Sequence, residues 1–242
     1  MNTQAAFDVV ALKAFKACLD DPVVWKGRSV RKWAASIVTD SSLLSELPTG
    51  TVSLAEVRQF CADTRHSDEA CFWVVVAWGG MRTNHARRAW DSRALWKPIL
   101  RDLRSGRLTQ RSMIYDRFLQ ASIPGLATAY FTKLMYFMSM GKRCFVLDQW
   151  TARSANMLQR VSAPMIHLYY SSSGAWVSRR NRGETYEAYC DLVEALAETV
   201  GKVPEQVEQS MFAGGGRHRW RRYVIDNGFT YKDRSSSSDD MP

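Results

Sequence analysis

The sequence predicts a mostly α-helical fold, and three observations support this class. Apolar residues recur at intervals of three and four, as in Val9, Leu12, Phe15 and Leu19, which is the spacing of one helix face. Strict alternation of apolar and polar residues, the pattern of a half-buried strand, is rare. Several apolar segments also begin with residues that favour helix starts. We therefore expect a series of short helices.

The helix starts can be justified in order along the chain. Ser53 and Glu56 have the spacing of a capping box. Ser67 precedes two acidic residues, which stabilise a first helical turn, and Pro204 suits the first position of a helix. We expect helices at residues 7–19, 29–39, 53–63, 68–77, 84–91, 96–105, 110–120, 128–140, 149–159, 185–200 and 204–212.

Two segments lack helical periodicity. Residues 163–183 are rich in turn formers, so an ordered loop is expected there. The end of the chain is mostly serine and aspartate, which cannot offset the entropy of ordering, so a disordered tail is expected at residues 232–242. Neither a repeat nor a flexible linker divides residues 1–231, so they are expected to form a single unit in which any two lobes share an interface.

Charge and composition narrow the class of partner. The formal net charge is +9, mostly from an excess of arginine, which favours a polyanion such as nucleic acid. The longest apolar blocks, residues 71–78 and 134–138, are far shorter than the roughly 20 residues of a membrane span. The N-terminus lacks the pattern of a secretory signal. We expect a cytoplasmic, monomeric protein without a membrane partner.

The cysteines and histidines argue against a metal centre. Five cysteines form no C-x-x-C pair, as expected of reduced thiols in a reducing compartment. The four histidines are scattered without an i, i+4 pair. The glycine run at residues 214–216 is not followed by Lys and Ser or Thr, so it is not a phosphate-binding P-loop. No metal and no cofactor is expected.

The most informative segment is residues 123–150. Pro124 and Gly125 interrupt the helical pattern, and a new helix begins within a few residues, which predicts a helix-hairpin-helix. Backbone N–H groups of such a hairpin, from Pro124 to Ala127, can bind a DNA phosphate at a helix N-terminus. The alternative is an ordinary connection between two helices.

An aspartate follows the hairpin helix and an apolar run. Asp148 lies where the next helix is expected to begin. A carboxylate at this place can stabilise positive charge on a deoxyribose while its glycosidic bond breaks. The alternative is that Asp148 only caps the helix, although capping and catalysis are compatible.

Residues 123–127, Ile-Pro-Gly-Leu-Ala, and residues 145–150, Phe-Val-Leu-Asp-Gln-Trp, resemble the hairpin and Val-Asp signature of the helix-hairpin-helix DNA glycosylase superfamily, within its 8-oxoguanine glycosylase branch. The resemblance covers residues 70–230 in order. It implies a mostly α, two-lobed fold with a DNA-binding groove between the lobes, and it assigns the essential aspartate to Asp148.

The resemblance also implies a lysine nucleophile in bifunctional members, but the family position falls here at Ala129. Lys133 lies one helical turn later and is the only charged residue between Ile123 and Gly141. A partly apolar site would make its amine easier to deprotonate. The alternatives are that Lys133 snorkels to the surface, or that Asp148 activates water in a monofunctional enzyme.

A base can be processed only after it leaves the duplex. The loop at residues 78–84 precedes a basic helix, where family members carry a residue that inserts into DNA. Its candidates are Met81, Arg82 and Asn84, and the expected phosphate contacts are Arg87 and Arg88. Further basic residues that could contact phosphate are Arg93, Lys97, Arg101, Arg104 and the cluster at residues 217–222.

Aromatic side chains could stack on the extruded base. Trp150 lies beside the expected catalytic aspartate, and Phe212 lies on the last expected helix. Together with Trp78 they are the expected members of a base pocket.

These observations lead to one function with two alternatives. The expected function is a DNA N-glycosylase that flips and excises a modified base from double-stranded DNA. The branch that the chain resembles includes phage-defence enzymes that remove glucosylated hydroxymethylcytosine, which points to a hypermodified phage cytosine. The alternatives are an 8-oxoguanine repair glycosylase/lyase and a non-catalytic helix-hairpin-helix DNA-binding protein.

Overall fold

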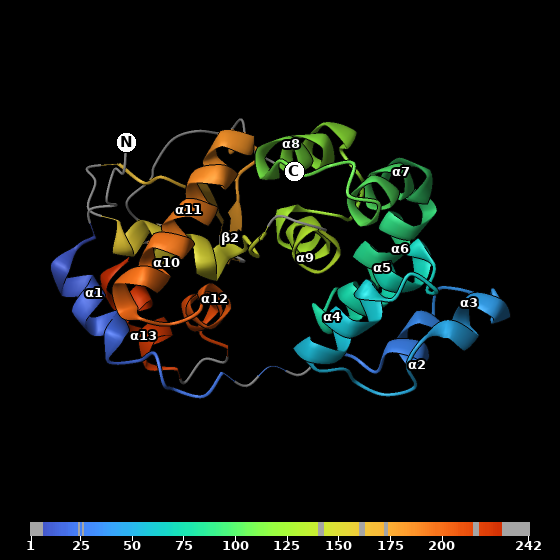
Figure 1. The fold of residues 1–242 in the computed structure, drawn as a ribbon, viewed down its shortest axis with the longest axis horizontal. Coiled ribbons are helices and arrows are strands. Elements are labelled where there is room, and N and C mark those ends of the chain that lie inside the picture. The colour runs from blue at the N-terminus through green and yellow to red at the C-terminus, as the bar shows by residue number, and fades with distance from the viewer. Residues whose placement is uncertain are drawn as a thin grey trace. The chain divides into compact units, whose positions relative to one another are not determined.

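The computed structural model describes residues 7–23, 25, 27–139, 143–159, 163–171, 174–214 and 218–228. These residues contain thirteen helices and one two-stranded antiparallel sheet, which confirms the mostly α-helical class (Figure 1). The chain divides into two compact units. We call residues 26–146 the continuous unit, and residues 1–25 with 147–242 the discontinuous unit. The expected tail at residues 232–242 lies outside the described residues.

The continuous unit is built around helix α5 (Asp68–Trp78). All of its residues from Ala70 to Ala77 are buried, because neighbouring helices pack against every side of it. Its Phe72 ring stacks on that of Trp96 at a centroid distance of 4.4 Å. The other helices are α2 (Val30–Ala34), α3 (Ser41–Glu46), α4 (Leu54–Ala62), α6 (Thr83–Asp91), α7 (Arg93–Arg104), α8 (Arg111–Ala121) and α9 (Thr128–Met138).

The discontinuous unit joins the N-terminal helix to the C-terminal part of the chain. Helix α1 (Val9–Lys16) packs against α10 (Gln149–Leu158) and α13 (Arg219–Asn227). The buried Phe15 ring meets the ring of Trp220 edge to face at 4.9 Å. The remaining elements are β1 (Leu168–Ser171), β2 (Gly174–Val177), α11 (Gly183–Val200) and α12 (Pro204–Phe212).

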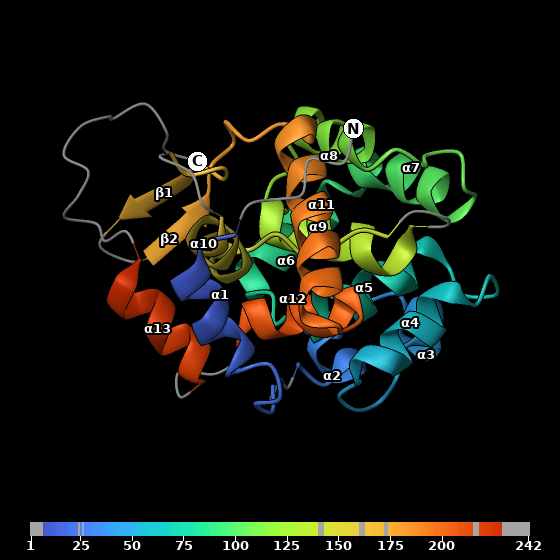
Figure 2. The same cartoon turned by 60° about the vertical axis from the view of Figure 1, so that its left-hand side comes forward.

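Helix α10 lies among most elements of this unit, since it contacts α1, α11, α12, α13 and strand β2. Figure 2 shows the two antiparallel strands beside α10. Their register pairs Leu168 with Val177 and Ser171 with Gly174. The arrangement places the N-terminus of α10, where Asp148 lies, within the packed part of the unit.

The structure corrects several expected elements. Residues 163–183 are not only loop, because β1 and β2 lie within them. Cross-strand pairs such as Tyr169 with Trp176, at a ring distance of 6.0 Å, stabilise this hairpin. Helices α3 and α13 were not expected. Each begins at a residue whose side chain accepts a backbone N–H, Asp40 for α3 and His218 for α13.

No helix in the described ranges combines the length and the apolar character that crossing a membrane requires.

Candidate functional site

The predicted hairpin joins α8 to α9 in the continuous unit. Ser122 and Gly125 have the left-handed φ angles of 46° and 78°, which turn the chain between the two helices. Ala127 is the N-cap of α9, and its side chain makes no capping bond. Pro124 and Ala127 are exposed. The first backbone N–H groups of α9 therefore follow an exposed turn without a competing side-chain acceptor, which is the geometry that binds an anion.

The hairpin packs directly on α6. A methyl group at Gly125 would overlap the carbonyl oxygen of His85 and would come within 3.1 Å of the Arg88 Cβ. Only glycine combines this close approach with a positive φ. The contact places the hairpin beside the outer face of the α6 region, where four predicted DNA contacts are exposed: Arg82, Asn84, Arg87 and Arg88.

The surface formed by the hairpin and α6 is electropositive. Burial lowers the pKa of His85, and the charges of Arg82 and Arg88 lower it further. Arg87 donates a 3.3 Å hydrogen bond to the Ser36 carbonyl and stays exposed. Met81, the third candidate for insertion into DNA, is completely buried and does not protrude. Arg82 and Asn84 remain the candidates in that loop.

Lys133 is 92% buried, with 8% of its surface exposed, near the N-terminal half of α9. Its side chain runs back along the helix, and Nζ donates a 2.9 Å hydrogen bond to the Ala129 carbonyl. The amine therefore lies one turn before its own Cα, beside the position that the resemblance assigns to the lysine. Nζ also lies 5.7 Å from the Tyr130 ring centroid, a cation–π contact.

Gly79 provides the space that the Lys133 stem occupies. A Cβ at Gly79 would lie 2.7 Å from Cδ and 3.2 Å from Cε of Lys133. Trp78 precedes this glycine and meets the Phe137 ring edge to face at 4.9 Å. The predicted pocket residue Trp78 thus belongs to the same part of the continuous unit as Lys133.

Asp148 lies in the discontinuous unit as the N-cap of α10. Its Oδ1 accepts hydrogen bonds from Trp150 N at 2.7 Å and Thr151 N at 3.1 Å. The Thr151 hydroxyl in turn accepts from Asp148 N at 2.9 Å, which completes a capping box. Oδ1 thus caps the helix, and Oδ2 accepts no hydrogen bond from the part of the chain that the structure describes.

The surroundings of Asp148 are largely buried. Burial raises the pKa of Tyr189, as do the charges of Glu208 and, more weakly, Asp148, while a hydrogen bond with Thr151 lowers it. On another side lies Arg221, whose pKa is lowered by burial and raised in part by the charge of Asp148. The carboxylate is therefore rigidly held and lies near a positive charge.

Trp150 and Phe212, two predicted pocket residues, are brought together by Arg221. The Arg221 guanidinium carbon lies 4.1 Å from the Trp150 ring centroid and 5.5 Å from that of Phe212. A second arginine, Arg153, lies 5.0 Å from the Trp150 ring. Sequence analysis included Arg221 in the basic cluster at residues 217–222 but did not single out Arg153, although Arg153 follows Trp150 at the i+3 spacing of one helix face.

Other predicted phosphate contacts have structural partners instead. The Arg104 side chain is buried and donates to Asp68 at 2.9 Å and to the carbonyls of His66 and Asp63. Lys97 pairs with Glu69. Arg93 lies 4.9 Å from the Trp90 ring, Arg219 pairs with Asp21, and Arg217 lies outside the described residues.

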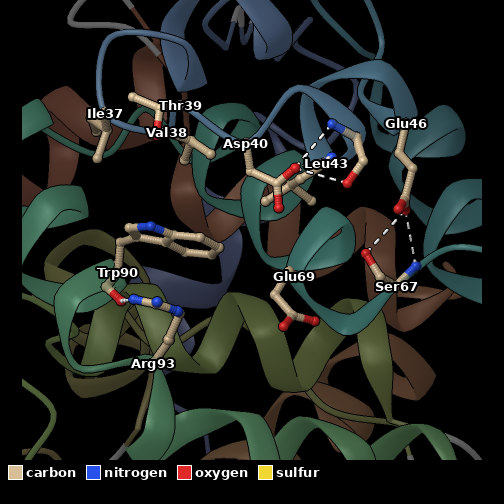
Figure 3. A pocket seen from close by; sticks show the side chains of 11 residues that line it. Ile37, Val38, Thr39, Asp40, Leu43, Glu46, Ser67, Glu69, Trp90 and Arg93 are labelled. Atoms are coloured by element: carbon tan, nitrogen blue, oxygen red, sulfur yellow. Dashed lines mark hydrogen bonds between the residues drawn. The ribbon is translucent and has the colours of Figure 1, made fainter.

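A pocket of about 410 Å³ lies elsewhere in the continuous unit. Figure 3 shows the Trp90 ring between the segment of Thr39 and the side chain of Arg93, with Asp40, Glu46 and Glu69 on the walls. Three carboxylates disfavour a phosphate there, although Arg93, one of the predicted phosphate contacts, is among the lining residues. In the described part of the chain, no group of three or more His, Cys, Asp or Glu residues could hold a metal ion.

A helix-hairpin-helix beside an arginine-rich helix, followed by a capping aspartate, is the combination expected of a DNA-glycosylase-like protein. The family model described as "Putative 8-oxoguanine DNA glycosylase OGG-like protein" matches residues 16–212. The match covers most of the chain, and the chain belongs to this family. No curated protein and no solved structure matches it.

Proposed function

We propose that this protein is a DNA N-glycosylase that excises a modified base, with Asp148 as its essential carboxylate. The observation that carries the proposal is that the two Asp148 oxygens differ in their hydrogen bonds. Oδ1 is held by two backbone N–H groups, and Oδ2 accepts no bond from the described residues. This arrangement supports a fixed negative charge aimed at a reacting group.

In the proposed reaction the bond between C1′ of the deoxyribose and the base nitrogen breaks, and its electron pair leaves with the base. Positive charge develops on C1′ and the ring oxygen, where the Asp148 carboxylate stabilises it. Water then adds its oxygen to C1′, and a proton ends on the departed base. In this form the enzyme is monofunctional.

Lys133 is the candidate nucleophile for a lyase step. Its amine is largely buried, and its stem is held in the space above Gly79. A neutral amine at this place would add to C1′ in place of water and lose a proton. The C1′–O4′ bond of the sugar then breaks, O4′ takes up a proton, and C1′ and the lysine nitrogen form the double bond of a Schiff base. We propose this role for Lys133 as the bifunctional form of the same activity.

The hairpin and α6 supply the proposed DNA contacts. The Gly125 backbone and the N-terminus of α9 bind one phosphate, and Arg87 and Arg88 bind others. Arg82 and Asn84 are the proposed residues that enter the duplex. Their shared exposure on one surface of the continuous unit supports this assignment.

The substrate that we propose is a hypermodified cytosine of phage DNA, in a defence role. The resemblance of residues 123–150 to the branch with phage-defence members supports it. The family's description names 8-oxoguanine and supports an oxidised purine as the alternative. A non-catalytic DNA-binding protein is the second alternative, because the capping bonds of Asp148 would serve that protein equally well.

The decisive experiment is base release from phage genomic DNA with different cytosine modifications and from duplexes with oxidised purines, followed by mass spectrometry. Asp148→Asn is the test variant, since asparagine retains the N-cap while it removes the charge. We expect a rate loss of roughly 100-fold or more with unchanged folding. If Asp148→Asn releases bases at the wild-type rate, the catalytic assignment of Asp148 is wrong. If the wild-type chain binds duplex DNA but releases no base from any of these substrates, the chain is a binding protein.

A further inference from the structure

Two arginines lie against Trp150 in the discontinuous unit. The guanidinium carbons of Arg221 and Arg153 are 4.1 Å and 5.0 Å from its ring centroid. The Arg153 group also lies 5.5 Å from the ring centroid of Tyr170 in β1. The two positive charges beside Trp150 therefore come from two elements far apart in the sequence, since Arg153 lies on α10 and Arg221 on α13. Strand β1 adds Tyr170 to the cluster.

Among the described residues, neither guanidinium group forms a direct ion pair with a carboxylate, and the charge of Asp148 acts on Arg221 without a hydrogen bond between them. Arg221 donates one hydrogen bond, from Nη2 to the Phe212 carbonyl at 2.9 Å, and Arg153 donates none to a described residue. The Nε atoms of both arginines are buried and without an acceptor. A guanidinium has five N–H donors, so most of this donor capacity is uncommitted. Buried donors without acceptors are costly, and an anion would relieve the cost.

The arginines are also held in place. Trp220, next to Arg221 on α13, is completely buried and donates a 2.9 Å hydrogen bond to the Ser154 hydroxyl of α10. Trp150 is tied to Asp148 through its backbone N–H. The cluster is therefore built on the same first turn of α10 that carries the proposed catalytic carboxylate.

We propose that Arg153 and Arg221, positioned by Trp150, bind a DNA backbone phosphate next to the nucleotide whose sugar faces Asp148. The identity of that nucleotide rests on the proposed function. Guanidinium forks match phosphate oxygens and form charge-assisted hydrogen bonds. In this arrangement the Trp150 ring orients two guanidinium groups.

The test is a binding measurement on a duplex with one stable abasic-site analogue. A single phosphate is replaced by a neutral methylphosphonate, and the replacement is moved stepwise along the strand. For the wild-type chain we expect an affinity loss of about tenfold at one or two positions beside the analogue. In Arg221→Gln and in Arg153→Gln the same replacement costs less, since one of the two guanidinium partners of that phosphate is gone. In the double variant it costs nothing further.

Arg222→Gln is the matched control. Arg222 is exposed on the same helix and lies outside the Trp150 cluster, so this variant should keep the wild-type position effect. The cluster variants should each lower the slope of log affinity against log salt by about one. Arg221→Lys keeps the charge but loses the forked donor geometry, and it replaces Arg221→Gln if that variant fails to fold. Its affinity for the duplex should lie between those of the wild type and Arg221→Gln.

The outcomes separate this proposal from the proposed function. If the cluster variants lose the same factor as wild type at every methylphosphonate, the phosphate site is wrong, and base release by wild type still supports the glycosylase. If the position effect depends on the arginines while no DNA releases a base, the phosphate site stands and the glycosylase assignment fails. A wild-type chain that does not bind the duplex contradicts both.

Discussion

The position of the Lys133 side chain depends on one small residue, Gly79. The stem of Lys133 fills the space that Gly79 leaves at the end of α5, and its amine is directed back toward Ala129. The ammonium is thereby moved about one helical turn from its own Cα. At this scale the position of the amine depends on the absence of a methyl group in a neighbouring helix.

Gly79→Ala is expected to displace the Lys133 amine. The added Cβ would lie 2.7 Å from Cδ, so the flexible stem must shift while the backbone stays in place. We expect borohydride-trapped adduct with abasic DNA to fall by roughly tenfold or more, with stability changed by about 1 kcal/mol or less.

Gly50→Ala is the matched control, because nothing lies within 4 Å of its added Cβ. Lys133→Ala should lose the adduct completely. Wild-type amounts of adduct in Gly79→Ala would contradict the positioning role of Gly79, and an adduct that persists in Lys133→Ala would show that Lys133 is not the nucleophile.

Two elements depend on single residues at their ends. The hairpin is joined to α6 by the close approach of Gly125 to His85. Helix α13, which carries Arg221, begins at His218, whose Nδ1 accepts the Trp220 N–H at 3.3 Å. The proposed DNA surface and the arginine cluster therefore each depend on a turn or a cap.

Gly125→Ala is expected to separate the hairpin from α6. The new methyl group would overlap a backbone carbonyl and would also force a non-glycine residue to φ +78°. We expect a loss of about 2 kcal/mol or more in the free energy of unfolding, together with weaker duplex binding. Chemical denaturation and fluorescence anisotropy measure the two effects.

Gly201→Ala provides the comparison. Gly201 has a similar φ of +67° with nothing within 4 Å of its added Cβ, so this variant tests backbone strain alone. It should lose about 1 kcal/mol of stability and bind DNA as wild type does. Equal DNA affinities for wild type and Gly125→Ala would refute the role of the hairpin.

The cap of α13 predicts a pH dependence. Burial lowers the pKa of His218 from its ordinary value of 6.5, and Arg221 and Arg219 lower it further, while Asp21 partly offsets the shift. Below about pH 6.5 the unfolded chain takes up a proton that the folded chain resists, so stability falls as the pH falls. This loss of stability continues as the pH falls, until the pH is below the pKa of His218 in the folded chain.

His218→Asn keeps a capping acceptor and removes the titration. The free energy of unfolding, measured by denaturant at pH 8 to pH 5, should fall less steeply in this variant than in wild type. His85, whose pKa is also lowered, contributes a slope of the same sign that remains. An unchanged slope would show that His218 does not govern the acid sensitivity.

At the scale of the whole molecule, the two ends of the described chain are tied into one unit. The backbone N–H of Asp8 donates to the Leu158 carbonyl at 2.9 Å, and Phe15 packs against Trp220. Residues from α1 therefore complete the core of a unit whose other elements begin after residue 146.

Phe15→Ala is expected to lower the free energy of unfolding by about 3–5 kcal/mol, because the side chain is completely buried. Val10→Ala on the same helix removes a side chain that is 70% exposed and should change stability by about 0.5 kcal/mol or less. Unfolding followed by tryptophan fluorescence measures both. Similar losses in the free energy of unfolding for the two variants would show that Phe15 does not contribute to the core of this unit.

Much of this organisation could be predicted from local sequence patterns. Apolar spacing and capping residues such as Ser53 and Asp148 depend on neighbours within one or two helical turns. The structure confirms the predicted capping box at Ser53 and the helix start at Asp148. Pro124 and Gly125 predicted the hairpin because they also act on the backbone of their immediate neighbours. The resemblance of residues 123–150 identified the family, which the match over residues 16–212 confirms.

Other features were decided only by tertiary packing. The β-hairpin within residues 163–183 depends on cross-strand pairs. Helix α13 depends on the packing of Trp220 against Phe15 and on its hydrogen bond to Ser154. The space beside Gly79 and the arginines around Trp150 arise where separate elements meet. Short-range spacing encodes the bonds within a helix, whereas these contacts join residues dozens of positions apart and form only when the chain has packed.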